Sequence, residues 1–175
     1  PGKIADFCLL SSLEDWMIES VYKNGEEVYT PFYQREEDML SFPDDFYKSI
    51  KLDSVDESIF QLRINKDVDT VKVNVIEVNS ASTFTDLSQV ELPVMDHVIQ
   101  WQNNNLALMA CLERYGKNQN VSFAFVKEAI KNNGAVASSW AHDHHNVMVM
   151  GTNVKDMITA VNHIINIQGG YCVSC

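Results

Sequence analysis

Two short apolar runs near the C-terminus constrain the fold of this chain more than any other feature. GAVASSWA occupies residues 134–141 and VMVMG occupies 147–151, and glycine bounds both runs. Short apolar runs that are partly β-branched and end at glycine are typical of buried strands. Between them stand His142, Asp143, His144, His145 and Asn146. The pattern therefore predicts two buried strands joined by a turn that carries this polar cluster.

The polar cluster at 142–146 is the densest group of metal-ligating and proton-transferring side chains in the sequence. Polar side chains on a stiff support suit a binding or catalytic site. Aspartate and asparagine are also common in solvated turns, because their side chains bond to nearby backbone. The residues alone leave both interpretations open.

The segments around the cluster predict one clear helix and two less certain elements. Asn153, with Asp156 three residues later, is typical of a helix start, and Gly169 of a helix end. Apolar residues recur between them at helical spacing, at Val154, Met157, Ile158, Val161, Ile164 and Ile165. Residues 121–134 are predicted as a second helix, opening after Asn120 and closing at Gly134. For 106–114 the sequence favours a central strand.

The first half of the chain favours strands separated by a surface segment. Residues 3–10 and 16–30 are predicted as short strands, and Asn24-Gly25 is a strong hairpin signal. Residues 31–58 are acidic and contain Pro31 and Pro43, which is typical of a connecting segment. Order returns at Ile59, and 70–78 alternates as a half-buried strand does. The expected class is α+β, with a mixed β-sheet layered against a few helices.

Composition excludes several classes of partner. The chain has 13 basic and 24 acidic residues and a net charge of −11, which argues against nucleic acid and anionic membrane as partners. No apolar run is long enough to span a membrane, so a cytoplasmic location is expected. Cys172 and Cys175 have C-x-x-C spacing without a second pair, which favours an incidental arrangement over a zinc or redox site. The start at Pro1 without methionine leads us to expect a fragment of a longer protein.

The C-terminal half resembles a known family. The order of Gly-Ala-x-Ala-Ser-Ser, Ala-His-Asp-x-His-Asn, Gly-Thr-Asn and Asp-Met at 134–157 is similar to the C-terminal domain of bacterial adenine deaminases. Residues 112–135 resemble the preceding part of that domain, although Lys117, Gln119 and Ser122 replace an expected glycine-rich stretch. PGKIADFCLL and the Asn-Gly hairpin resemble the strands that return an amidohydrolase chain from its barrel to a β-sandwich. The resemblance implies three parts, namely 1–30 as this sandwich return, 31–58 as an acidic connection and 59–175 as the adenine deaminase α+β domain, truncated at its end.

The resemblance implies hydrolysis of adenine to hypoxanthine and ammonia by the longer protein. In that family a metal-bound hydroxide attacks the purine, and a divalent ion (manganese, iron or zinc) makes this hydroxide available near neutral pH. The implied ligands lie in the catalytic barrel and include a His-x-His motif that this chain lacks. We therefore expect no metal in this chain and no adenine deamination by it alone. Adenine and the chain's own barrel are the implied partners, and a homo-oligomer remains open.

Under this resemblance, His142, Asp143, His145 and Asn146 are the candidate residues for contact with the purine or with a group beside a metal ligand. His144 occupies the variable position of the motif and is the weakest candidate. In the alternative interpretation, Asp143 orders the turn, one histidine donates to a backbone carbonyl and Asn146 adopts a left-handed conformation.

Two further classes stay open on the residues alone. One is a small metal-binding module that uses residues 142–145 with the cysteines, and the other is an interaction or oligomerisation domain without chemistry. Ser138 and Ser139 are expected to bond across the sheet, because a nucleophile needs an exposed hydroxyl and an oriented base.

Overall fold

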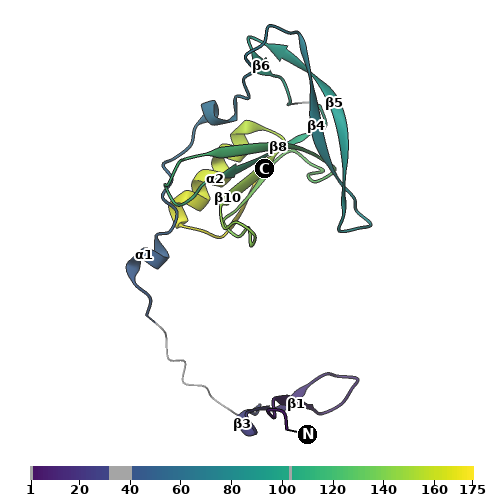
Figure 1. Cartoon of the computed structure of the whole chain (residues 1–175), viewed down its shortest axis with the longest axis vertical. Coiled ribbons are helices and arrows are strands. Elements are labelled where there is room, and N and C mark those ends of the chain that lie inside the picture. Colours follow the sequence, from purple (N-terminus) through teal and green to yellow (C-terminus); the bar gives the residue numbers. More distant parts are fainter. Residues whose placement is uncertain (1, 32–40, 103) are drawn as a thin grey trace. The chain divides into compact units, whose positions relative to one another are not determined.

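The computed structural model describes residues 2–31, 41–102 and 104–175. It divides into two compact units, Pro1–Ser41 and Phe42–Cys175, which we call unit 1 and unit 2. Most of the predicted connecting segment belongs to neither ordered sheet, and its residues 32–40 lie outside the described residues. Figure 1 shows the elements of both units along the chain.

Unit 1 is a three-stranded antiparallel sheet in the order β1-β2-β3. Its strands are β1 (Phe7–Leu10), β2 (Ile18–Lys23) and β3 (Glu26–Tyr29). Asn24 and Gly25 form the β2–β3 turn with φ of 54° and 82°, so the hairpin predicted from this dipeptide is confirmed. The unit leaves several large apolar side chains exposed, among them Ile4, Leu13, Trp16 and Met17. A sheet this small does not bury its own apolar surface.

Unit 2 is an eight-stranded sheet with one long helix. Its short elements are α1 (Asp44–Tyr47) and the 3-10 helix η1 (Glu57–Phe60). The strands are β4 (Thr70–Val78), β5 (Thr85–Met95), β6 (Val98–Ile99), β7 (Ala107–Leu112), β8 (Val121–Lys127), β9 (Ala135–Ser138), β10 (Val147–Gly151) and β11 (Tyr171–Ser174), and the long helix is α2 (Val154–Ile167). The order in the sheet is β11-β9-β10-β7-β8-β4-β5-β6, with β4 and β8 parallel and the other pairs antiparallel. The expected α+β class with a mixed sheet is confirmed.

The helix predicted at 121–134 is wrong, because residues 121–127 form strand β8. Val121, Phe123 and Phe125 alternate onto the face that β7 presents through Leu112, Ala110 and Leu108. Strand β8 pairs with β7 on one side and with β4 on the other, so its backbone hydrogen bonds are made to neighbouring strands and not within a helix. Strand β5 was not expected, because its first half, from Thr85 to Gln89, is polar.

The predicted helix α2 is confirmed and both of its ends are capped. The Asn153 side chain accepts a hydrogen bond from Asp156 N at 2.9 Å, and Gln168 takes a left-handed conformation just before Gly169. Hydrogen bonds from the Asn153 amide and the Ser174 hydroxyl lower the pKa of the Asp156 carboxyl. Ser174 belongs to β11, so the helix start and the edge strand are tied together.

One face of the sheet, which we call the core face, is covered by α2. Met157, Ala160, Val161, Ile164 and Ile165 are the buried side chains of the helix. Beneath them, β9 and β10 contribute small residues, namely Ala135, Ala137 and Gly151. A Cβ atom added at Gly151 would lie 2.5 Å from Met157 Cγ and 2.8 Å from Ala135 Cβ. The helix therefore approaches the strands closely at this point, and Figure 1 shows α2 beside β10.

Two amide side chains of α2 hold the segment that precedes η1. Gln168 accepts from Ile50 N and donates to Ile50 O, both at 3.1 Å. Asn162 accepts from Val55 N at 2.8 Å and donates to Val55 O at 2.9 Å. Each amide thus satisfies the N–H and the C=O of one residue, as a neighbouring strand would.

On the opposite face of the sheet, β11, β9, β10, β7 and β8 contribute two adjacent cross-strand rows, while the β4–β5 part of that face carries Lys72 and Glu91. One row is Tyr171, Ser138, Met148, Cys111 and Ser122, and the other is Val173, Val136, Met150, Met109 and Ala124. We call these ten residues the open face, because no helix or strand among the described residues packs on them. None of the ten is charged.

Replacing Gly151 by alanine tests the close approach of α2. The added methyl group has no space, so we expect the free energy of unfolding to fall by about 1–3 kcal/mol, as measured by urea denaturation. Thr159→Ala on the exposed side of the same helix is the control and should change it by less than about 0.5 kcal/mol. Equal effects of the two substitutions would contradict the close approach.

Candidate functional site

The polar cluster lies in a loop, residues 139–146, which joins β9 to β10 as predicted. Strands β9 and β10 pair up to Ser138 and Met148. The Ser138 hydroxyl accepts from Trp140 N at 2.9 Å, and Ser139 exchanges two hydrogen bonds with Gly170. Both serines therefore fix the backbone at the base of the loop, and neither is an activated nucleophile.

A tight turn holds the centre of the loop. The carbonyl of Ala141 accepts from the N–H groups of both His144 and His145, at 3.1 and 2.6 Å. His145 is the residue with a left-handed backbone, at φ 55°, so the expectation that Asn146 would adopt this conformation is wrong. Asn146 instead turns inward, and its side-chain oxygen accepts from Arg114 N at 3.4 Å.

Arg114 braces the base of the loop from the end of β7. One guanidinium nitrogen donates to the Ser139 carbonyl at 3.1 Å, and another donates to the Ser49 hydroxyl. The backbone N–H of the same residue bonds to Asn146 on the other side of the loop. A single half-buried arginine thus holds both ends of the loop. Hydrogen bonds from a charged donor are stronger than neutral ones.

His144 lies over the open face and contacts Cys111. Each of its ring nitrogens is 3.9 Å from Cys111 Sγ, and Nδ1 accepts from Asn146 N at 3.1 Å. Burial raises the pKa of the Cys111 thiol, and a hydrogen bond from Asn146 opposes part of this effect. His144 and Asn146 therefore serve the internal structure of the loop.

The remaining three candidates point into solvent. The side chains of His142 and Asp143 are 82% and 84% exposed, and Nε2 of His142 lies 3.3 Å from Oδ1 of Asp143. His145 is exposed as well. An exposed pair of this kind contributes little to stability. The loop thus carries one carboxylate and two imidazoles outward on a braced backbone.

The described residues contain no group of three or more histidine, cysteine, aspartate or glutamate side chains that could hold a metal ion. His144 turns toward Cys111 while His142 and Asp143 point outward. All four cysteines are free, and Cys172 and Cys175 lie on and just after β11. Residues 142–145 with the cysteines therefore do not assemble a metal centre in this part of the chain.

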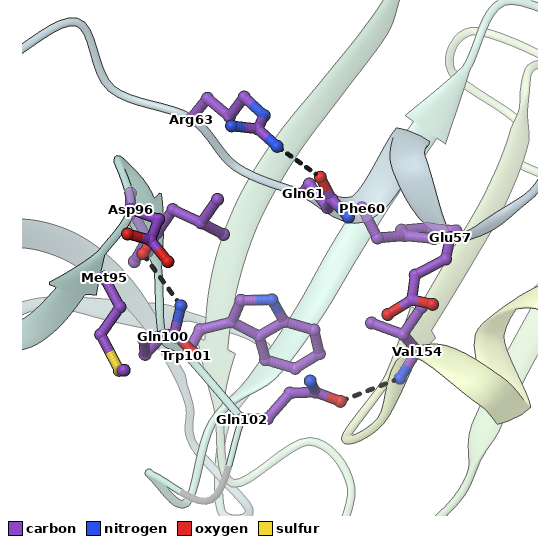
Figure 2. Close-up of a pocket in the computed structure, with 12 residues that line it drawn as sticks. Glu57, Phe60, Gln61, Arg63, Met95, Asp96, Gln100, Trp101, Gln102 and Val154 are labelled. Atoms are coloured by element: carbon purple, nitrogen blue, oxygen red, sulfur yellow. Dashed lines mark hydrogen bonds between the residues drawn. The ribbon is translucent and has the colours of Figure 1, made fainter.

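A hollow of about 530 Å³ lies elsewhere in unit 2, between η1, the β5–β6 hairpin and the start of α2. Figure 2 shows Arg63 bonded to Gln61, and Gln102 accepting from Val154 N at 3.2 Å. Gln100 in its wall donates to the Val98 carbonyl at 3.1 Å, Glu57 and Asp96 are exposed carboxylates, and Trp101 is only 3% exposed. The loop and this hollow flank opposite ends of β10, whose length is about 17 Å. Because the loop gathers two exposed imidazoles and a carboxylate on a braced backbone, we take the loop as the candidate site.

Comparison with known proteins agrees with the sequence resemblance. The family model of the adenine deaminase C-terminal domain matches residues 82–175. The chain belongs to this family. A protein named adenine deaminase from Clostridium perfringens is 43% identical over 182 residues, which cover 99% of the chain and 32% of that protein. Adenine deaminase 2 of Oenococcus oeni and adenine deaminase of Lactobacillus delbrueckii are each 41% identical over 99% and 98% of the chain, and 30% of each relative is covered.

The chain thus spans about a third of the length of these adenine deaminases. No described helix has the length and apolar character that crossing a membrane requires.

Two residues that organise the 139–146 loop were not among the sequence candidates. Arg114 was noted only as the end of a strand, and its bonds to Ser139 and Ser49 join residues 25 and 65 positions away. Trp140 was treated as part of an apolar strand, yet it is 68% exposed and packs edge-on against Tyr171 at 6.2 Å between ring centroids. A large aromatic next to a polar cluster is a usable signal, whereas the partners of Arg114 have no local signature.

Replacing Arg114 by methionine tests the brace. We expect backbone amides in 139–146 to exchange with solvent about tenfold faster, because a charged hydrogen bond contributes about 1.5–3 kcal/mol. Hydrogen exchange measured by mass spectrometry reports this change. Arg63→Met is the matched control, since the Arg63 guanidinium is exposed, lies outside the loop and donates to the Gln61 side chain. Unchanged exchange in the loop would show that the brace is unimportant.

The environment of Cys111 predicts its reactivity. With a raised pKa and partial burial, Cys111 presents less accessible thiolate at pH 8 than the exposed Cys8 and Cys175. We expect it to react with a disulfide reagent at least about tenfold more slowly than those two, and its rate to keep rising above pH 9. In urea all four cysteines should react alike. Equal rates in the folded chain would contradict the packing of this thiol.

Proposed function

We propose that this chain is the C-terminal part of a longer adenine deaminase. That protein adds water to adenine and releases ammonia, which leaves hypoxanthine. Support comes from the family of residues 82–175 and from relatives that bear this name and match 98–99% of the chain. Domain boundaries follow the same proposal, with 1–30 as a sandwich return, 31–58 as a connection and 59–175 as the C-terminal domain. A cytoplasmic location and inactivity of the isolated chain belong to it as well.

Within this enzyme, the 139–146 loop is proposed to face the substrate. The single observation that carries this role is the exposure of His142, Asp143 and His145 on a backbone held by Arg114, Ser138 and Ser139. None of these three side chains is used to hold unit 2 together. Fixed backbone with free polar side chains is the arrangement that binding sites require.

Adenine offers partners of both kinds to these side chains. Its ring nitrogens accept hydrogen bonds, while its amine and one ring N–H donate them. The Asp143 carboxylate accepts only, and a neutral imidazole has one donor and one acceptor. His142, Asp143 and His145 are proposed to contact the purine or a group beside it, and Asn146 to position them through Arg114 and Cys111.

The divalent metal that the resemblance implies is assigned to the preceding part of the enzyme. Residues 142–145 do not converge as ligands, and the described residues offer no other group of three suitable side chains. Manganese, iron and zinc are all compatible with this assignment.

Alanine at both His142 and Asp143 in the complete enzyme tests the substrate-facing role. We expect kcat/KM for adenine to fall at least about tenfold, because each lost hydrogen bond to a charged or polar partner is worth about 1.4 kcal/mol or more. Ammonia release measured over a range of adenine concentrations gives kcat and KM separately.

The matched control is alanine at Asp96 and His97. These residues are also adjacent and exposed in a turn of unit 2, and their positive φ values of 51° and 63° make the substitution harder on the backbone. The control should leave kcat/KM within about twofold. If both double variants behave alike, the 139–146 loop does not face the substrate.

A further inference from the structure

The open face of unit 2 lacks the composition of a solvated sheet. In antiparallel sheets with one wet face, apolar residues on the core side alternate with polar residues on the water side. Here the wet side carries Val136, Met109, Met148 and Met150 at its centre, and its ten residues include no charge in a chain whose net charge is −11. Strand β10 reads VMVMG, apolar on both faces. Strands of this kind are normally covered on both sides.

Exposure increases toward the β11 edge of this face. Val173 is 76% exposed and Tyr171 is 61% exposed, and Trp140 of the loop extends the apolar surface by packing on Tyr171. The methionines beside them are half-buried by their strand neighbours. Exposed apolar surface of this continuity marks an interface. Methionine and tyrosine are enriched at such interfaces.

The candidate site borders the same surface. His144 folds from the loop onto Cys111, and Trp140 folds onto Tyr171, so the loop and the open face are continuous. A body that packs on the open face therefore meets the exposed His142, Asp143 and His145 at its rim. One partner could therefore cover the open face and also bring a substrate to the 139–146 loop.

We propose that the open face is the docking surface for the catalytic portion that precedes this chain in the complete enzyme, an inference that rests on the proposed function. The relatives are about three times as long as the chain, which leaves some two thirds of each outside the match. The family model that matches describes a C-terminal domain, so the remaining length comes before it. Unit 1 also exposes many apolar side chains and calls for additional protein on its own account.

A second copy of the chain fits the observations less well. Two copies would each bring a net charge of −11 to the contact, whereas the uncharged face needs only an apolar counterpart. Self-association through this face would also bring two 139–146 loops together without a catalytic centre. The preceding catalytic portion would both cover the open face and place a substrate beside the 139–146 loop.

Hydroxyl-radical footprinting is carried out on the 175-residue chain and on the complete protein that contains it, and the labelling of each side chain is compared. In the complete protein we expect labelling of Tyr171 to fall about fivefold, as burial in the core of an interface requires, and labelling of Met148 and Met150 to fall with it. Met95 and Phe84, which are exposed in unit 2 outside the open face, are the internal controls and should label equally in both samples. Equal labelling of the open face in both samples overturns the proposal, and so does protection of the controls to the same degree.

A charge on the face provides a second test in the complete protein. Val173→Glu should restore labelling of Tyr171 and Met150 to within about twofold of the isolated chain, because a buried unpaired charge is costly. Phe84→Glu is the control at a site of similar exposure and should leave the protection intact. The urea midpoint of the 175-residue chain with Val173→Glu confirms that folding is preserved. Persistent protection in this variant overturns the proposal.

Two further measurements separate the alternatives. Sedimentation of the 175-residue chain tests for a second copy, since a dimer whose open face is already protected contradicts the proposed occupant. A gene whose reading frame encodes no protein ahead of this chain would also contradict the proposed occupant. Ammonia release from adenine is measured on the footprinted protein. Protection without turnover leaves the docking surface standing and refutes only the proposed activity.

Discussion

The close approach of α2 to the centre of the sheet is the contact on which the rest of unit 2 depends. It requires small residues where the helix crosses the strands, and Ala135, Ala137 and Gly151 supply them. Once seated, the helix orients the elements at both of its ends. Asp156 bonds to Ser174 of β11, and Gln168 bonds to Ile50 in the segment before η1. A displaced helix would therefore release the edge strand and the connecting segment together.

Sequence patterns predicted the elements whose signal is local. The caps and the 3.6-residue period of α2, the Asn24-Gly25 turn and the alternation of β4 each lie within fewer than twenty residues. The prediction for β8 was wrong because the apolar residues of 121–130 fit both helical and strand spacing. The interaction that decides between them is the parallel pairing of β8 with β4, some fifty residues earlier. Strand β5 was not predicted because its first half is polar, although nine residue pairs with β4 fix it in the sheet. Long-range pairing is what a single sequence conceals.

The candidate site divides in the same way. The apolar runs at 134–141 and 147–151 correctly located the loop, because their spacing sets where the chain must turn. Which side chains face outward was not predictable, because it follows from the Ala141 carbonyl and the Arg114 guanidinium. Asn146 had the same standing as His142 in the sequence, yet it points inward to Arg114. The continuous apolar character of β10 was also a visible sign that both faces of the sheet need cover.

The bonds of Arg114 have a mechanical consequence. Its carbonyl accepts from Lys51 N at 2.6 Å and its guanidinium holds Ser49, while the same guanidinium holds Ser139 at the base of the loop. A pull on unit 2 from the N-terminal side of residues 49–51 would act on their hydrogen bonds to Arg114 and Gln168. The arginine then transmits it to the loop within a single side chain. Residues 49–51 and the histidine-bearing loop are therefore coupled through one arginine, so a displacement of this segment would also displace the base of the loop.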